Sequence, residues 1–203
     1  MKESQPIEKK VISRIYGRGR GWAFTKTDFI AEFGEQNIHQ ALSALNKAGT
    51  IRRVCHGLYD YPRQSQTLGE LSPDIDQVAH ALARKFNWRI QPSGDTALNL
   101  LGLSTQVPGK WTYLSDGPSR QYQIGMQGIA FRHAALKDTG LSHYESSLLV
   151  QALKALGKDQ INDETIEKLR HWLAPSMRKR VLQDTSKTTG WVFELIKRIC
   201  ETQ

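Results

Sequence analysis

The chain has 203 residues, of which 39% are hydrophobic and 24% charged, and its 28 lysines and arginines outnumber its 20 aspartates and glutamates. This composition excludes extended disorder, and no stretch approaches the roughly 20 apolar residues of a membrane span or forms the apolar core of a signal peptide. Cys55 and Cys200 lie far apart and match no metal-binding or redox spacing, and we expect a cytoplasmic, soluble protein.

Positive charge is concentrated in the first third of the chain. Residues 1–63 contain eleven lysines and arginines against six aspartates and glutamates, so they carry most of the net charge of +8. A small basic domain is typical of a protein that binds a polyanion such as DNA, and a basic surface that only aids solubility is the alternative.

The N-terminal residues predict two helices separated by a glycine-rich break. Residues 6–16 carry an apolar side chain at every fourth position, which indicates a helix, and the glycines of 17–21 end it. Residues 22–24 predict a short extended segment. Thr25 and Asp28 resemble a capping box, so we expect a second helix from there to about residue 33.

A third helix and a hairpin complete the first 63 residues. Residues 37–48 predict a helix with one apolar face, which Gly49 ends. Residues 51–61 predict two short strands around a turn at His56 and Gly57, where glycine permits a positive φ.

The rest of the chain predicts a second, mixed domain. Residues 64–71 are polar without sustained periodicity and predict a linker, so the expected domains are 1–63 and 72–203. The second domain begins with predicted helices at 75–86 and 96–101, and its tail has helical stripes. Between them lie strand-like runs at 111–115, 120–124 and 129–133. The predicted class is α+β: an N-terminal winged helix-turn-helix, then a small antiparallel sheet and C-terminal helices.

The order helix, helix, helix, hairpin is that of a winged helix-turn-helix, whose third helix enters the major groove of DNA. Burial of the apolar face turns Asn, Gln, Ser and His outward, and these side chains read base edges. Basic hairpin and loop residues, and the start of the second helix, suit phosphate contacts. The predicted DNA-binding residues are Arg18, Arg20, Thr25, Lys26, Thr27, Asn37, His39, Gln40, Ser43, Lys47, Arg52, Arg53 and His56.

Within this set we expect some residues to contact base edges and others to contact phosphates. The base-reading residues are Asn37, His39, Gln40 and Ser43. The phosphate contacts are assigned mainly to Lys26, Lys47, Arg52 and Arg53, with His56 at the wing tip.

Several segments resemble a known family. Segments 21–29 (GWAFTKTDF), 41–49 (ALSALNKAG) and 51–59 (IRRVCHGLY) are similar to the N-terminal winged helix of AbiEi-like antitoxins. Segments 96–103 (TALNLLGL) and 113–120 (YLSDGPSR) resemble the C-terminal domain of a subgroup of that family. The resemblance implies an antitoxin of a type IV, abortive-infection toxin–antitoxin system. Such a protein represses its own operon and counteracts a nucleotidyltransferase-type toxin, without necessarily forming a stable complex with it.

Enzymatic function is not expected. The six histidines form no HExxH motif, the cysteines lie in no catalytic signature, and no Gly-x-Ser-x-Gly elbow exists. We therefore predict no catalytic residue, no metal and no cofactor.

Two other functions remain open at this point. In one, the protein is a winged-helix regulator whose second domain senses a ligand through the aromatic residues Trp88, Trp111, Tyr113, Tyr122 and Phe131. In the other, the winged helix is a protein-interaction module. Asp116, Ser119 and Arg120 are candidates for a partner-facing loop, although Asp-Gly-Pro is also an ordinary turn. The oligomeric state is also open.

Overall fold

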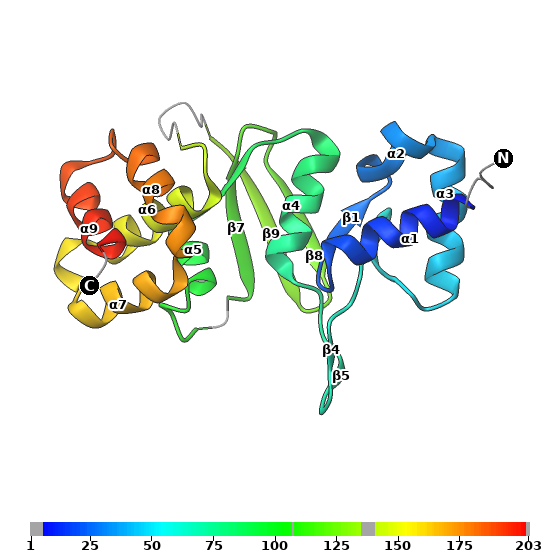
Figure 1. The fold of residues 1–203 in the computed structure, drawn as a ribbon, viewed down its shortest axis with the longest axis horizontal. Helices are drawn as coiled ribbons and strands as arrows, with labels where there is room; N and C mark the ends of the chain where they lie inside the picture. Colours follow the sequence, from blue (N-terminus) through cyan, green and yellow to red (C-terminus); the bar gives the residue numbers. More distant parts are fainter. Residues whose placement is uncertain (1–5, 107, 135–140, 202–203) are drawn as a thin grey trace. The chain divides into compact units, whose positions relative to one another are not determined.

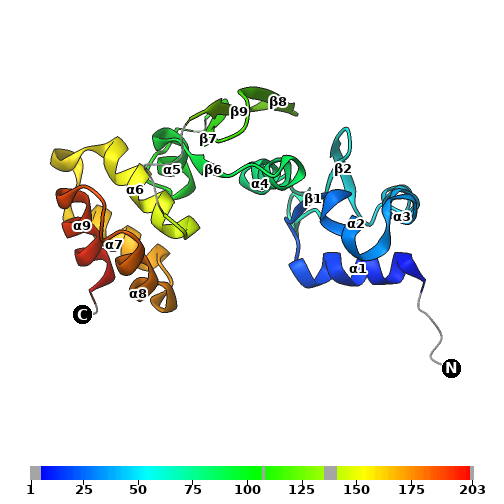
Figure 2. The same cartoon turned by 90° about the horizontal axis from the view of Figure 1, so that it is seen from above.

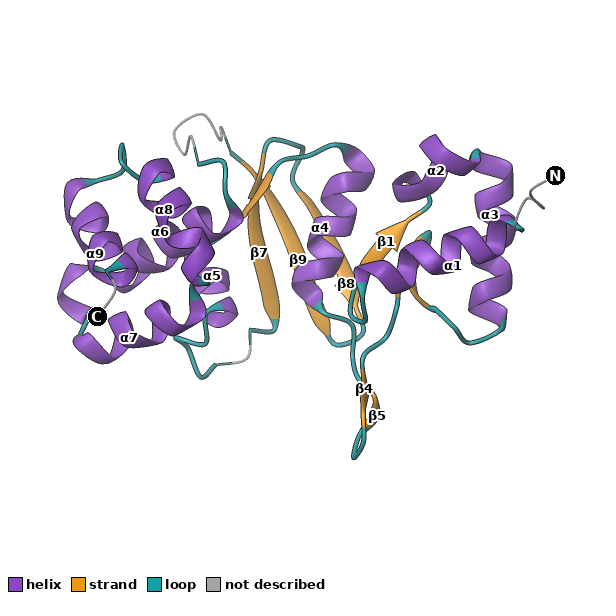
Figure 3. Ribbon diagram, viewed as in Figure 1, coloured by secondary structure: helices purple, strands orange, loops and turns teal. Residues whose placement is uncertain are grey.

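The computed structural model describes residues 6–106, 108–134 and 141–201, so the first five residues of the predicted N-terminal domain and the last two of the predicted second domain lie outside the described residues. The chain forms two compact units, Met1–Trp88 and Arg89–Gln203 (Figure 1). Each unit combines helices with short strands (Figure 3), which confirms the predicted α+β class.

The first unit has the winged helix-turn-helix topology. Its elements are α1 (Ile7–Arg18), β1 (Ala23–Thr25), α2 (Thr27–Phe33), α3 (Glu35–Lys47), β2 (Arg52–Cys55), β3 (Leu58–Asp60), β4 (Gln64–Ser65), β5 (Gly69–Glu70) and α4 (Ile75–Phe86). Strands β1, β3 and β2 form an antiparallel sheet in that order, with β2 and β3 as the wing. The predicted extended segment before the second helix is thus a strand of this sheet.

The core of this unit comes from the predicted apolar stripes. Val11 and Ile15 of α1 pack with Ile38, Leu42 and Leu45 of α3, and all are 2% exposed or less. Burying each such side chain contributes on the order of 1.5–3 kcal/mol relative to leaving it in water. The burial fixes which side of α3 faces solvent.

The connection from α2 to α3 is a single residue. Gly34 has φ of 77°, a conformation that costs other residues energy, and it closes α2 while opening α3. Helix α3 therefore begins at Glu35, two residues before the predicted start.

Two features depart from the predicted boundary near residues 64–71. Strands β4 and β5 pair as a small hairpin within the segment predicted as a linker. Helix α4, expected in the second domain, packs against β1, α2 and β3 of the first unit. Its Arg84 donates to the carboxylate of Asp28 at 2.7 Å and to the backbone O of Ala23 at 2.8 Å.

The second unit is a four-stranded sheet followed by helices. Its elements are β6 (Ile90–Pro92), α5 (Gly94–Leu100), β7 (Lys110–Ser115), β8 (Arg120–Ile124), β9 (Gln127–His133), α6 (Tyr144–Leu156), the 3-10 helix η2 (Lys158–Gln160), α7 (Asp163–Trp172), α8 (Pro175–Asp184) and α9 (Gly190–Cys200). Strand β6, which the sequence did not predict, adds an edge to the three predicted strands.

The strand order is β6-β7-β9-β8, so the sheet is mixed rather than wholly antiparallel. The β6–β7 and β8–β9 pairs are antiparallel as expected, whereas β7 and β9 are parallel. The reason is the connection after β7, which carries the chain past the position of β9 to the outer edge. Strand β9 then returns to lie between β7 and β8.

Helices cover one part of this sheet and build their own core. Helix α5 contacts β7 and helix α6 contacts β6, whereas β8 lies at the outer edge (Figure 2). Apolar side chains of α6, α7, α8 and α9, such as Leu149, Leu169, Val181 and Ile196, are fully buried together. The helical stripes predicted for the tail are confirmed as these helices.

None of the helices in the described part of the chain combines the length and the apolar character that a bilayer crossing demands.

Candidate nucleic-acid interface

Side-chain hydrogen bonds fix the start of α2. Asp28 Oδ2 accepts from the Thr25 backbone N–H at 2.9 Å, which is one half of the predicted capping box. The Thr25 hydroxyl lies 2.7 Å from the Thr27 hydroxyl, and Thr25 is fully buried. Thr27 is exposed. Of these two predicted phosphate contacts, only Thr27 reaches the surface.

The solvent side of α3 carries a continuous polar stripe. Helical spacing places four residues opposite the buried apolar face: Gln36, Gln40, Ser43 and Lys47. Ser43 is half-buried and the other three are exposed. Glutamine pairs with adenine, serine permits a close approach to the groove, and lysine suits a phosphate. Gln36, which the sequence analysis missed, extends the predicted set by one turn.

Asn37 and His39 flank this α3 stripe on opposite sides. Asn37 Nδ2 donates to the backbone O of Phe33 at 2.9 Å, so the amide joins α3 to the end of α2. His39 is exposed. Of the four predicted base-reading residues, Gln40 and Ser43 lie on the stripe, His39 lies beside it, and Asn37 lies off it.

Two exposed ion pairs occupy the N-terminal end of α3 and its neighbourhood. Lys26 binds Glu35, and this hydrogen bond lowers the pKa of the Glu35 carboxyl. Arg14 Nη1 lies 2.6 Å from Glu32 Oε2. The charge of Lys26, a predicted phosphate contact, is therefore balanced by an acid of α3 itself.

The wing tip gathers positive charge from two elements. Arg53 Nη2 lies 3.0 Å from His56 Nδ1, and both residues are exposed. Lys85 of α4 reaches the same turn, with its Nζ 3.9 Å from the position that a Cβ on Gly57 would take. Burial raises the pKa of the Cys55 thiol beside them, against the opposing influence of the Lys85 and Arg53 charges. No carboxylate among the described residues forms an ion pair with Arg53 or Lys85.

Arg52, next to Arg53 in the chain, is held inside the hairpin. Its Nε and Nη2 donate to the Asp60 carboxylate at 3.0 and 2.6 Å, and its Nη1 donates to Glu70 at 2.8 Å and to the backbone O of Leu71 at 2.9 Å. Burial raises the pKa of Asp60, which is 1% exposed, and the Arg52 guanidinium opposes that rise. Arg52 is thus committed to the fold and is not available as the predicted phosphate contact.

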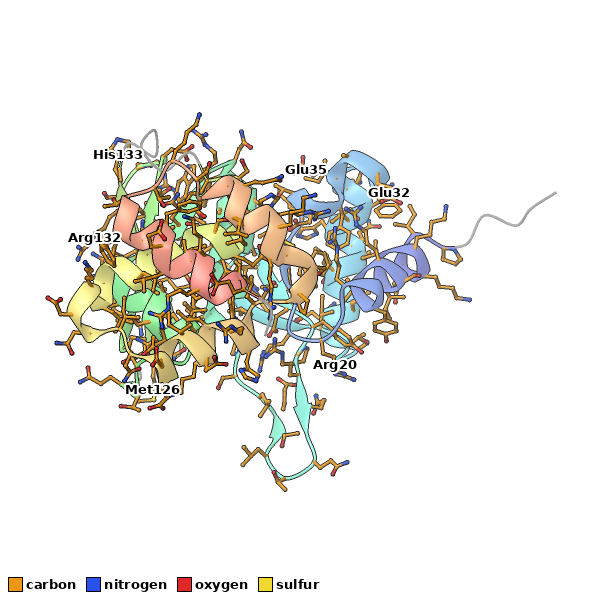
Figure 4. The ribbon with its side chains drawn as sticks, turned by 60° about the vertical axis from the view of Figure 1, so that its left-hand side comes forward. Arg20, Glu32, Glu35, Met126, Arg132 and His133 are labelled. Atoms are coloured by element: carbon orange, nitrogen blue, oxygen red, sulfur yellow. The ribbon has the colours of Figure 1, made fainter. Side chains whose placement is uncertain are left out.

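Arg18 and Arg20 do not join this interface. Arg20 donates to the backbone O of Pro62 at 2.8 Å and lies 4.5 Å from the ring centre of Tyr61. Arg18 lies 5.7 Å from the ring of Trp22. Figure 4 shows Arg20 well apart from Glu35, the first residue of α3. These two arginines form a separate basic cluster at the C-terminal end of α1.

In the second unit, the Ser115–Arg120 loop is held by its own side chains. The Ser115 hydroxyl accepts from the Gly117 N–H at 3.0 Å, and Ser119 Oγ accepts from the His133 N–H at 3.0 Å. Asp116 binds the Arg89 backbone N–H and Nε, and the hydrogen bond from the Arg89 side chain is the main cause that lowers the Asp116 pKa. The side chains of this loop are bonded within it and to neighbouring segments, as in a structural turn.

Two open depressions in the second unit are each bordered by one of the aromatic residues considered for ligand sensing. Tyr113 and Phe131 are buried with ring centres 6.0 Å apart. One open depression of about 350 Å³ is bordered by Tyr122, and another of about 260 Å³ by Phe131; neither touches Trp111 or Tyr113. Most of the residues around both are polar or small: Gly109, Lys110, Gln121, Gln123, Gly128, Ser119, Arg120, Ala130 and Arg132.

The part of the chain that the structure describes contains no group of three or more His, Cys, Asp or Glu side chains able to hold a metal ion.

Comparison with known proteins gives one family and a distant structural likeness. A family model described as "Family of unknown function (DUF6088)" matches residues 10–181. No curated protein matches the sequence. The crystal structure of the RV2827C protein from Mycobacterium tuberculosis aligns with a TM-score of 0.39 and 14% identity, over 96% of this chain and 76% of that one.

Proposed function

The chain belongs to the DUF6088 family, whose function is unknown, and we propose that it is a cytoplasmic regulator that binds double-stranded DNA sequence-specifically through its winged helix. The observation that carries the proposal is the α3 stripe of Gln36, Gln40, Ser43 and Lys47. It is uncharged except at its end, and no acidic side chain interrupts it. A stripe that is uncharged up to a final lysine suits base edges followed by a phosphate.

The roles within the interface follow from chemistry and position. Gln36, Gln40 and Ser43 read base edges in the major groove, and His39 contributes from the side. Lys47 binds a phosphate at the end of the stripe. The wing tip adds phosphate contacts from Arg53 and from the sequence-distant Lys85. Arg52 supports these contacts indirectly, because it holds the hairpin that presents Arg53.

Binding to DNA upstream of the protein's own gene tests this proposal. Fluorescence anisotropy with that duplex and with a shuffled duplex of equal composition, over a salt series, should give tighter binding to the first and weakening of both with salt. Lys47→Ala should weaken binding to both duplexes, whereas Lys154→Ala, on the exposed surface of α6, is the matched control and should not. Equal affinity for both duplexes at every salt concentration would remove the sequence-specific function.

We propose in addition that the protein is the antitoxin of a type IV system, as its resemblance to AbiEi-like antitoxins implies. In this role it represses its own operon and counteracts a nucleotidyltransferase-type toxin encoded beside it. Coexpression with the product of the adjacent gene should restore growth that this product alone arrests. An adjacent gene that encodes no nucleotidyltransferase-like protein, or growth arrest that the chain does not relieve, would contradict the antitoxin role and leave DNA binding intact.

A further inference from the structure

The outer edge of the second unit's sheet is strand β8, which has a neighbouring described strand on one side only. Among the described strands β8 pairs with β9 alone, and Figure 2 shows it at the border of the sheet. The opposite border differs, since β6 is in contact with α6. An exposed edge strand offers its backbone donors and acceptors as a template for a further strand.

The turn between β8 and β9 determines which backbone groups face outward. Two residues, Gly125 and Met126, connect the strands, and only Gly125 has a positive φ, 57°. This fits a type II′ turn, in which the flanking pair, Ile124 and Gln127, is the hydrogen-bonded one. Alternation along β8 then directs the N–H and C=O groups of Gln121 and Gln123 away from β9.

Strand β8 lacks the features that usually protect such an edge. Proteins block edges with prolines, bulges or charges within the strand. Residues 120–124 contain no proline, their register with β9 is continuous, and their only charged residue, Arg120, is at the start. Gln121 and Gln123, which carry the outward groups, are exposed.

We propose that β8 pairs antiparallel with β8 of a second copy of this chain, around a two-fold axis at Tyr122. This register pairs all five residues and joins Gln121 of each copy to Gln123 of the other, so every outward backbone group gains a partner. Moving the axis to Gln121 or Gln123 pairs an outward residue with a loop or turn residue instead. The axis at Tyr122 also places Arg120 opposite Ile124, away from the other copy's arginine.

The side chains across the junction are complementary. The glutamines of the two copies lie opposite each other on one face, where Gln123 Nε2 already donates to the backbone O of Gly125 at 3.0 Å and leaves Oε1 to accept from the Gln121 amide of the other copy. The two Tyr122 side chains meet on the other face, and such cross-strand pairs stabilise neighbouring strands. The two copies then share a continuous sheet with two-fold symmetry, the commonest symmetry of homodimers. This self-association goes beyond DNA binding and does not depend on it. If the DNA-binding proposal also holds, the dimer presents two winged helices to an operator with two half-sites.

Light scattering coupled to size-exclusion chromatography, without DNA, tests the pairing on the full chain. The wild type, with a chain mass of 23.0 kDa, should elute with the mass of a dimer. In the proposed register, Gln121→Lys/Gln123→Lys places lysine against lysine twice and should give a monomer. Gln121→Lys/Gln123→Glu places lysine against glutamate twice and should give a dimer. The two variants differ only at residue 123, so they control for each other, and far-ultraviolet circular dichroism should show that both are folded.

A second variant addresses the backbone directly. Gln123→Pro removes an outward N–H that has no partner in β9, so it should shift the mass to that of a monomer with little change in the melting temperature. Gln123→Ala keeps the N–H and should remain dimeric. A wild type that is monomeric at all concentrations, or equal masses for the Lys/Lys and Lys/Glu variants, would overturn the pairing. DNA binding by a monomer to a single half-site would leave the proposed function standing while this inference failed.

Discussion

The two faces of the wing use neighbouring arginines in opposite ways. Arg52 faces β5 and is fixed by Asp60 and Glu70, whereas Arg53, one residue later, faces solvent beside His56. The alternation of a β-strand imposes this difference, because successive side chains point to opposite sides. A pair of arginines in a sequence is thus not a doubled phosphate contact. One residue holds the wing and the other is presented by it.

The largest effect expected from this comparison concerns stability. Arg52→Ala leaves the carboxylate of Asp60 buried without its cation, a change that typically costs about 3–5 kcal/mol. Arg53→Ala leaves no buried carboxylate without its cation, and it should change the free energy of unfolding by less than about 0.5 kcal/mol. Urea denaturation of both variants measures the difference. Similar losses for the two would show that the faces of the wing are not distinct.

The next effect concerns sequence discrimination by α3. Gln40→Ala removes a base-reading amide, which should reduce the preference for the operator over shuffled DNA by about 1–3 kcal/mol. Asn37→Ala is the matched control, because the amide of Asn37 already bonds to Phe33 and lies off the α3 stripe. Competition binding with the two duplexes measures the ratio. A larger loss of preference from Asn37→Ala would mean that the other flank of α3 enters the groove.

A smaller effect tests the wing tip. Arg53→Ala and Lys85→Ala should each weaken binding to all sequences alike and reduce the slope of log affinity against log salt by about 1, since each removes one phosphate contact. Arg20→Ala should leave the slope unchanged, because Arg20 lies in the separate cluster at the end of α1. An unchanged slope for Lys85→Ala together with a reduced slope for Arg53→Ala would remove α4 from the interface.

Local patterns predicted most of the elements, and long-range packing produced the exceptions. The apolar stripe of α3 and the glycine turn at Gly57 act within a few residues, so both were predictable. Lys85 was not, because its place at the wing depends on α4 folding back onto β1. Strand β6 is three residues long and has no period of its own, so its pairing with β7 leaves no signal in the sequence.

The candidate site shows the same limit. Residue type and position on a predicted element selected Arg52, Arg53, Thr25 and Asn37 as DNA contacts, and three of these four are held by the fold. What a polar side chain is free to bind depends on the partners that the fold supplies. One signal for Gln36 was present in the sequence. It lies four residues before Gln40, so helical spacing places both side chains on the face opposite the predicted apolar face.

The smallest expected effect concerns the contribution to stability of Asp184, a side chain of the second unit that is held by hydrogen bonds as Arg52 is in the first. Asp184, at the end of α8, accepts hydrogen bonds from the backbone N–H groups of Ser142 and His143, just before α6. Burial alone would raise the pKa of Asp184, but these N–H groups, together with the Ser146 side chain and the charge of His143, outweigh it and the pKa is lowered. A lowered pKa in the folded state contributes stability that is present above the unfolded pKa, about 3.9, and that is lost as the pH falls through the folded value.

Asp184→Ala should therefore cost about 1 kcal/mol at neutral pH, as the loss of a helix cap does. Thermal unfolding of the variant and the wild type should show this gap closing below about pH 4. A gap that persisted unchanged in acid would mean that Asp184 stabilises the helices by packing rather than by its charge.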